Sequence, residues 1–348
     1  MHRSVAYALL AAILFGASTP FAKMLVGAMS PLLLAGVLYL GSGVGLTLIR
    51  AARDRGWTPS GLSWREWPWF IGAILFGGAL GPVALLFGLT HTSGAAASLL
   101  LNLEAVLTAV IAWVVFRENA DRRIVLGMLA IVAGGAVLAW PSSAEDGSAG
   151  TWMGSLAVIA ACLCWAIDNN LTRKVSTADA LFVAGIKGLT AGSVNCALAL
   201  SLGASLPAAS TLAATLAVGF LGYGISLVMF VLALRGLGTA RTGAYFSIAP
   251  FVGATVALLM LDESSTPSLW FAAALMAWGV WLHLTEHHEH EHEHEPLEHS
   301  HPHIHDAHHQ HEHDDAWDGK APHTHRHVHA PLIHTHAHFP DIHHRHPH

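Results

Sequence analysis

Residues 93–118 read SGAAASLLLNLEAVLTAVIAWVVFRE, a run of small and aliphatic residues whose only charged members are Glu104, Arg117 and Glu118. About 20 apolar residues is the length that an α-helix needs to cross the ~30 Å hydrocarbon layer of a membrane. A membrane β-barrel would instead need shorter segments of alternating hydrophobicity. The stretch therefore predicts a transmembrane helix.

Similar apolar runs recur along the chain up to Thr285. The 348 residues are 53% hydrophobic and 11% charged, whereas soluble proteins have about 25% charged residues. We predict ten spans, at residues 4–27, 31–50, 67–88, 93–116, 122–140, 151–171, 178–202, 211–234, 241–261 and 268–284. The fold class is thus all-α and polytopic, and the first span is too long for a signal peptide and is expected to stay uncleaved.

The charges divide the chain at Glu286. Residues 1–285 hold 14 of the 17 Lys and Arg residues and 11 of the 23 acids. Residues 286–348 hold 3 bases, 12 acids and 24 of the 27 histidines. A weakly basic membrane body followed by a strongly acidic, histidine-rich tail is therefore expected.

Basic residues in the connections between spans indicate the orientation of the body. The N-terminus and the even-numbered connections carry twelve Lys or Arg residues, and the odd-numbered connections carry none. Because basic residues accumulate on the cytoplasmic side, both termini are predicted to be cytoplasmic in a multi-pass protein of the cell membrane. Of the two bases outside these connections, Lys23 is expected to snorkel to the membrane surface.

The quoted stretch has a counterpart in the second half of the body. GTARTGAYFSIAPFVGATVALLMLDE at residues 238–263 aligns with it at a constant offset of 145, and residues 11–23 resemble residues 160–172. Because each copy would hold five spans, an odd number, the second copy is inserted upside down. Inverted repeats of this kind build secondary transporters whose substrate site lies near mid-membrane. We predict three parts: five-helix repeats at residues 1–140 and 141–285, and a tail at residues 286–348.

In these features the chain resembles the drug/metabolite transporter superfamily, and more narrowly its EamA-type branch. The likeness is clearest in TSGAAASLLLNLEAVLTAVIAWVVFRE (92–118) and in SIAPFVG, which keeps the family's proline at Pro250. The chain departs from the pattern at Ala105, where proline is expected, and in the FRE and LDE that replace Gly-Glu. The resemblance covers residues 4–284. It implies a carrier of metabolites, amino acids or drugs, commonly an exporter and often coupled to protons.

Glu104 is the first candidate for transport and proton coupling. A charged side chain at bilayer depth costs on the order of 2.5–3.5 kcal/mol on insertion scales and is therefore a functional candidate. Desolvation raises the pKa of a carboxyl group in an apolar cavity, which suits proton exchange near neutral pH. A structural carboxyl that hydrogen-bonds between helices is the alternative. Asn102, the second candidate, lies two residues away and is expected on a different helix face.

Asp168 and Lys187 are the other charged candidates. Asp168 precedes Arg173 and Lys174 by five and six residues, so an interfacial charge cluster is the simpler prediction and a transport role the alternative. Lys187 lies about ten residues into the seventh span. Snorkelling to the interface and a transport role are left open for it.

Prolines mark the helices expected to break. The candidates are Pro20, Pro82 and Pro250, because backbone groups freed by a proline are tolerated in a membrane only where protein or a water-filled cavity satisfies them. The third span has three glycines within the five residues before Pro82 and is predicted to be the most strongly bent. Ordinary packing through small residues is the alternative.

The tail alternates histidine with acidic residues. It has few aliphatic residues and six prolines, which predicts disorder. Imidazole suits Zn, Ni, Co and Cu, and carboxylates can complete the ligand set, so we expect the tail to bind these ions. The candidate ligands are His287, His288, His290, His292, His294, His299, His301, His303, His305, His308, His309, His311 and His313.

The function predicted from these patterns is a secondary transporter, a proton-coupled exporter of a small metabolite or drug that works by alternating access and carries a metal-binding tail. The alternatives are a Zn, Ni or Co exporter fed by the tail and a membrane-anchored metal buffer. No nucleophile–base pair or phosphate loop stands out, so we predict no enzyme and no required cofactor. The expected partners are the lipid bilayer, a small-molecule substrate and divalent ions, without nucleic acid; a homodimer is left open.

Overall fold

A computed structural model describes most of the chain. The described residues are 2–55, 58–116, 122–140, 149–175, 178–237, 242, 245–284, 289–294, 298–303, 323–328 and 332–337. The chain divides into two compact units, Met1–Thr285 and Glu286–His348. Each unit is described by itself below, as the membrane body and the tail.

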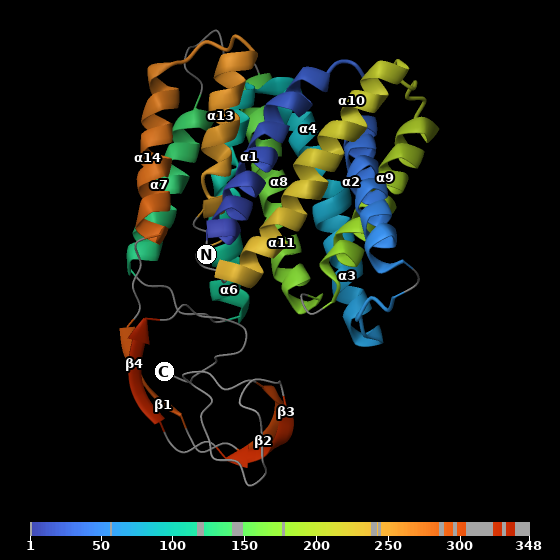
Figure 1. The fold of residues 1–348 in the computed structure, drawn as a ribbon. Coiled ribbons are helices and arrows are strands. Elements are labelled where there is room, and N and C mark those ends of the chain that lie inside the picture. Colours follow the sequence, from blue (N-terminus) through green and yellow to red (C-terminus); the bar gives the residue numbers. More distant parts are fainter. Residues whose placement is uncertain are drawn as a thin grey trace. The chain divides into compact units, whose positions relative to one another are not determined.

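The membrane body is a bundle of helices (Figure 1). Its elements are α1 (His2–Leu25), α2 (Pro31–Asp54), η1 (Trp64–Glu66), α3 (Trp67–Ala73), η2 (Ile74–Leu80), α4 (Gly81–His91), α5 (Gly94–Leu100), α6 (Asn102–Phe116), α7 (Arg122–Ala139), α8 (Ala149–Thr172), η3 (Arg173–Val175), α9 (Ala180–Ser201), α10 (Ala209–Gly219), η4 (Phe220–Ile225), α11 (Ser226–Leu237), α13 (Ala249–Met260) and α14 (Pro267–Leu284). Within the described residues, seven helical runs are long and apolar enough to cross a membrane. Three shorter apolar helices, Val125–Ala139, Ala249–Met260 and Pro267–Leu282, accompany them. The predicted all-α polytopic membrane class is confirmed.

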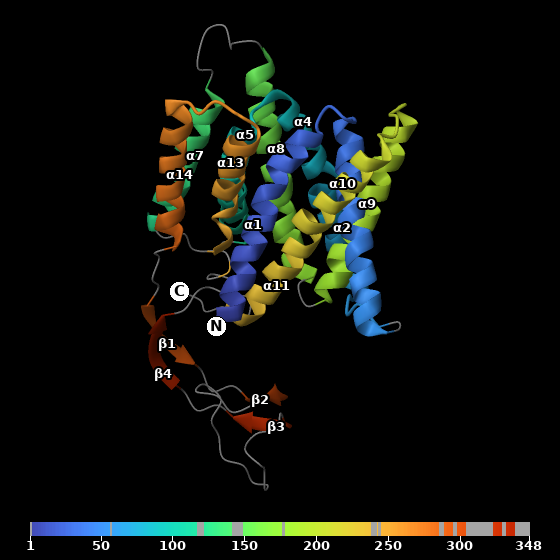
Figure 2. The ribbon, with the colours of Figure 1, turned by 45° about the horizontal axis from the view of Figure 1, so that its top comes forward.

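The two ends of the bundle differ in charge. We call the end where α1 begins the N-terminal face; it also holds the end of α2 and the start of α9 (Figures 1 and 2). The opposite end, formed by residues 26–30, 92–93, 202–208 and 261–266, is called the far face. Arg53 and Arg65 lie at the N-terminal face, whereas Lys23 is in the last turn of α1, near the far face.

Between the two faces the outer surface of the bundle is apolar. Leu48, Val114 and Leu259 are each more than 60% exposed, as expected for side chains that contact lipid rather than water. Trp64 and Trp140 are exposed at helix ends, where tryptophan commonly lies at the membrane–water interface. The buried side chains are mainly alanine, leucine and small polar residues.

Helices α2 and α9 pack against each other along their length, through glycines. Gly36 approaches the backbone of Gly192, and Gly43 approaches that of Gly188. Residue numbers rise along α2 while they fall along α9, so the two helices are antiparallel. A Cβ atom added at Gly188 would lie 2.6 Å from the backbone nitrogen of Gly43. The close packing therefore depends on the absence of side chains at these positions.

Two further pairs repeat this antiparallel arrangement. Helices α7 and α14 meet where Gly134 faces Ala272 and Gly127 faces Gly279. Helices α5 and α13 meet where Ser98 faces Gly253. The α2–α9 and α7–α14 pairs each join a helix of residues 1–140 to the helix about 145 residues later. In the third pair α5 belongs to the fourth span and α13 to the ninth, but the helix that corresponds to α13 is α6.

The third and eighth spans both contain a π-helix. In the third span it is η2, which holds Gly77 and Gly78 and runs directly into Gly81 and Pro82. In the eighth span it is η4, about 145 residues later, with Gly222 at the place that corresponds to Gly77. The third span is thus irregular at its glycines, as the eighth span is, and the prediction that it is the most strongly bent stays a prediction. π-Helical segments are frequent at functional sites.

The three proline candidates differ in outcome. Pro82 follows the π-helix η2 directly, and Pro250 is in the first turn of α13, after a turn at Ser247 and Ile248. The prediction of a helix break at Pro20 is wrong, because α1 continues through Pro20 to Leu25. Proline removes one i→i−4 hydrogen bond, and the packing of α1 against α11 and α13 keeps the rest of the helix in place.

The tail contains four short strands, β1 (Glu289–His294), β2 (Glu298–His303), β3 (His323–Val328) and β4 (Leu332–Ala337). β1 pairs with β4 and β2 with β3, both antiparallel, and His292 stands opposite His334. The prediction that the tail is disordered stays a prediction. The alternation of residue types in β1 has the two-residue period of a strand.

The contact between α2 and α9 gives a first prediction. Gly188→Ala is expected to lower the free energy of unfolding by roughly 1–3 kcal/mol, because its Cβ meets backbone atoms that cannot yield easily. The measurement is the midpoint of thermal unfolding in detergent. Gly185→Ala on the same helix is the control, since the nearest atom there is the Thr47 hydroxyl at 3.1 Å. Equal midpoints for the two variants would contradict this packing.

Candidate functional site

An ion pair lies inside the body, between α8 and α9. The carboxylate of Asp168 contacts the ammonium group of Lys187, and Asp168 is 6% exposed. The Thr172 hydroxyl donates a 2.9 Å hydrogen bond to the second carboxylate oxygen. The prediction that Asp168 joins an interfacial cluster is therefore wrong, and Lys187 does not snorkel to the membrane surface. The reason is tertiary: α9 brings Lys187 to Asp168 from 19 residues away in the chain.

The glycines of η2 make room for this ion pair. A Cβ atom at Gly77 would lie 1.9 Å from the Asp168 carboxylate oxygen, and one at Gly78 would lie 2.7 Å from the Ala191 side chain. Any larger residue at position 77 would displace the carboxylate from Lys187. The π-helix and the ion pair are therefore one structural unit.

Side chains from neighbouring helices complete the hydrogen bonds of η2. The Gly77 carbonyl accepts hydrogen bonds from the Tyr39 hydroxyl at 2.7 Å and from the Trp165 indole nitrogen at 3.0 Å. In the i→i+5 pattern of a π-helix its partner would be the N–H of residue 82, which is proline and has none. Asn195 also donates to the Ala79 carbonyl, at 3.5 Å. Helices α2, α8 and α9 thus hold the irregular segment.

Glu104 lies beside this unit, in the first turn of α6. Its carboxylate accepts a 2.9 Å hydrogen bond from the Asn169 side chain, which also approaches the Thr108 hydroxyl at 3.3 Å. Asn169 follows Asp168 directly, so one turn of α8 connects the Glu104 carboxylate to the buried ion pair. The structure therefore brings together three of the four predicted residues.

Asn102 is the exception among the predicted site residues. Its side chain donates to the Leu99 carbonyl at 2.9 Å and approaches the Met276 sulfur at 3.8 Å. The prediction that Asn102 and Glu104 occupy different faces of the helix is confirmed. Asn102 instead stabilises the turn at Leu101 that separates α5 from α6, as Asn side chains commonly do when they bind nearby backbone.

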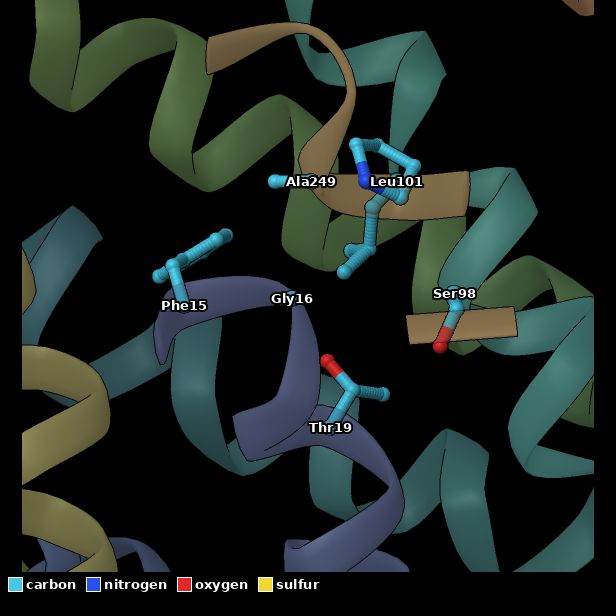
Figure 3. Close-up of a pocket in the computed structure, with 7 residues that line it drawn as sticks. Phe15, Gly16, Thr19, Ser98, Leu101 and Ala249 are labelled. Carbon is cyan, nitrogen blue, oxygen red and sulfur yellow. The ribbon is translucent and has the colours of Figure 1, made fainter. Parts of the chain in front are cut away.

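A small cavity lies where α1, α5 and α13 meet (Figure 3). Its lining residues are Phe15, Gly16, Thr19, Ser98, Leu101, Ala249 and Pro250. Its volume is about 10 Å³, room for about one water molecule and far too little for a metabolite.

The cavity carries one buried side-chain hydroxyl that has no hydrogen-bond partner among the described residues. The Ser98 side chain is 1% exposed and its hydroxyl has no hydrogen-bond partner in the structure. Thr19 contributes a second buried hydroxyl from α1. The backbone carbonyl of Gly16 lacks its usual helical donor, the N–H of residue 20, because that residue is proline. A buried polar group without a partner is unfavourable, so a water molecule or a ligand oxygen is the group that fits here.

Aromatic rings connect the cavity to both π-helices. Phe15, which lines the cavity, lies 6.0 Å from the Tyr223 ring of η4 and 5.4 Å from Phe246. Tyr223 in turn lies 5.6 Å from Tyr39, the residue that binds the Gly77 carbonyl of η2. Packed rings thus form a continuous chain of contacts from the cavity to Tyr223 and Tyr39.

Sequence reasoning missed Ser98, Thr19, Tyr39 and Trp165. Serine, threonine and aromatic residues occur throughout membrane helices, so their type alone gives no signal. The sequence did contain two signals for the unpaired backbone near these residues. Pro20 stands four residues after Gly16, and Pro82 stands five residues after Gly77. Each proline leaves a carbonyl in need of a donor.

The histidines named as metal ligands belong to the tail. His287, His288, His305, His308, His309, His311 and His313 lie outside the described residues. The other six are in β1 and β2, where the backbone is described. Within the part of the chain that the structure describes, no three His, Cys, Asp or Glu side chains lie close enough to hold a metal ion. Metal binding by the tail stays a prediction.

Comparisons with known proteins give the following matches. Residues 2–140 and 152–285 each match the EamA-like transporter family. An uncharacterized transporter of Methanothermobacter thermautotrophicus is 26% identical over 291 residues, which cover 78% of this chain and 83% of that protein. A protein of known crystal structure is 22% identical and superposes with a TM-score of 0.61. The match covers 81% of this chain and 97% of that protein's chain. At that identity the likeness concerns the fold alone.

The ion pair gives a second prediction. Asp168→Asn is expected to lower the free energy of unfolding by about 3–5 kcal/mol, because the Lys187 ammonium is left buried without a counter-charge. Adding Lys187→Met to Asp168→Asn is expected to recover most of this loss. The measurement is again thermal unfolding in detergent. A double variant as unstable as the single one would show that the charge pairing is not what stabilises this region.

Proposed function

The chain belongs to the EamA-like transporter family, and we propose that it is a secondary transporter that exports a small metabolite or drug across the cell membrane by alternating access. The two halves that rock against each other are residues 1–140 and 141–285. The observation that carries the proposal is the cavity with the unpartnered Ser98 hydroxyl, because its lining comes from α1 and α5 of one half and α13 of the other. Inverted-repeat transporters bind substrate at such a place.

The helix packing supports an inverted repeat. Helices α2 and α9, and α7 and α14, are matching helices that pack antiparallel, and α5 of the fourth span packs against α13 of the ninth. The third and eighth spans carry π-helices at corresponding positions. A two-fold axis in the plane of the membrane, relating the two halves, produces this pairing. Because of that axis the two halves can exchange conformations, and the exchange turns the opening from one face of the membrane to the other.

Proton coupling is assigned to Glu104. Its carboxylate is half-buried, bonded to Asn169, and separated by one residue of α8 from the Asp168–Lys187 ion pair. Protonation would cancel its charge and weaken the charge-assisted hydrogen bond from Asn169. Because Asp168 already has Lys187 as its counter-charge, Glu104 is the carboxylate that can exchange a proton without leaving a lysine unpaired.

We propose that the substrate is organic rather than a bare metal ion. The polar groups at the cavity are hydroxyls and backbone carbonyls, which are poor ligands for Zn, Ni or Co compared with imidazole and thiolate. The tail holds the imidazoles, and we assign it metal binding in the cytoplasm, where the basic connections place both termini. Its part is to respond to metal ions or to buffer them.

The transport proposal gives a third prediction. Purified protein in liposomes that enclose a pH-sensitive dye is exposed to a panel of amino acids, organic cations and antibiotics. A substrate is expected to evoke proton movement with wild-type protein, and Glu104→Gln is expected to reduce the signal to that of empty liposomes. Exchange of labelled for unlabelled substrate should survive in Glu104→Gln, since that reaction needs no net proton transfer.

The control for this experiment is Glu66→Gln, the same change on an exposed acid. Glu66 accepts a 2.7 Å hydrogen bond from the Ser63 amide, and glutamine can replace it there. Proton movement should be unchanged in this variant. Undiminished proton-driven transport by Glu104→Gln would refute the coupling assignment, and the absence of any evoked transport or exchange across the panel would count against the exporter.

The tail gives a fourth prediction. Deleting residues 286–348 is expected to remove nearly all Zn²⁺ binding, measured by competition with a zinc-sensitive dye, because 24 of the 27 histidines go with them. Substrate exchange in liposomes should continue, since the body forms a compact unit of its own. Zinc binding that persists in the truncated protein would place the metal site in the body instead.

A further inference from the structure

On the far face, a carboxylate of the second half binds the first half. Glu263, in the connection between α13 and α14, accepts hydrogen bonds from the backbone N–H groups of Gly94 at 2.6 Å and Ala95 at 2.9 Å. These amides form the first turn of α5. Lys23 lies near Glu263 and donates to the carbonyls of Leu89 and Thr92, the latter at 2.7 Å. We call the Glu263 contact the far latch.

On the N-terminal face, the halves are joined by an ion pair and by a backbone hydrogen bond from the Asp179 amide to the Ser60 carbonyl at 2.9 Å. Arg53 at the end of α2 contacts Asp179, with 2.5 Å between Nη2 and Oδ2, and the Arg50 Nε lies 3.9 Å from Oδ1. Arg53 also contacts Asp54 of its own helix. Asp179 caps α9 by accepting from the Phe182 amide at 3.0 Å. We call the Arg53–Asp179 contact the near latch.

Each latch connects the two halves at one face only, and both are closed here, where the cavity is too small for a metabolite. We propose that Glu263 and Asp179 are gating residues for opposite faces, and that the near latch opens more readily than the far latch. This inference rests on the proposed alternating access. It assigns the opening of each face to a specific contact.

The two latches differ in chemistry, which decides the order of opening. The far latch consists of charge-assisted hydrogen bonds from backbone amides, at a helix N-terminus whose dipole favours a carboxylate. The near latch is an ion pair in which the Arg53 side chain is 46% exposed, and such pairs are weak and screened by salt. The resting protein should therefore open to the N-terminal face, where an exporter takes up its substrate.

The test measures access to the cavity from each face. Ser98→Cys is introduced after the native Cys162, Cys164 and Cys196 are replaced by alanine, and a membrane-impermeant thiol reagent is applied to either side of oriented vesicles. Labelling is expected to be faster from the N-terminal face and to accelerate with salt from that face only. Should Ser98→Cys fail to fold, Thr19→Cys reports on the same cavity.

Each latch variant should change labelling from one face. Asp179→Asn keeps a good helix cap but removes the charge, and is expected to increase labelling from the N-terminal face roughly two- to fivefold. Glu263→Gln is expected to increase labelling from the far face by about tenfold, because one of its two amide bonds loses its acceptor. The controls are Glu66→Gln, an acid at the N-terminal face that is bonded to Ser63 of its own turn, and Asp262→Asn in the same connection as Glu263.

The outcomes separate this inference from the transport proposal. Variants that increase labelling from both faces equally, or controls that behave as the latch variants do, would show that Glu263 and Asp179 only stabilise the fold. A wild-type protein labelled from both faces at the same rate, regardless of salt, would also overturn the order of opening. Substrate exchange by the unmodified protein tests the transporter independently of either result.

Discussion

A backbone carbonyl inside a membrane has no water to bind, and this constraint shapes the centre of the body. Pro82 cannot supply an N–H to the Gly77 carbonyl, so Tyr39 and Trp165 donate to it from two other helices. The same absence of side chain at Gly77 admits the Asp168 carboxylate, which then requires Lys187. One irregular turn thus fixes the relative positions of α2, α4, α8 and α9.

The close packing of matching helices follows from a second constraint. Lipid is as apolar as the helix surfaces, so association depends on shape, and glycine lets backbones approach. Gly43 against Gly188 and Gly127 against Gly279 join the halves in this way. Around Ser98 the packing is less complete, and the remaining space lies between the halves. The space has room for about one water molecule.

Charge is distributed according to what each region must do. Among the described residues, the centre keeps the Asp168–Lys187 pair and the Glu104 carboxylate, which is hydrogen-bonded to Asn169, because an uncompensated ion there is costly. At the two faces, charged side chains connect the halves. Water there weakens these contacts, so they are easier to break. The tail, in water, concentrates imidazole and carboxylate groups without needing a core.

The sequence by itself determined the membrane class, the helix positions and the irregular third span, because hydrophobic runs, glycine and proline act over short distances. It also singled out Glu104, which the structure places beside Asn169 of α8. It could not decide that Asp168 faces Lys187 rather than Arg173, or that Ser98 lacks a partner, since those facts depend on which helices become neighbours. The sequence-based prediction of a helix break at Pro20 was wrong, because the surrounding helices keep α1 continuous. Only tertiary packing selects among the partners that a buried polar group could have.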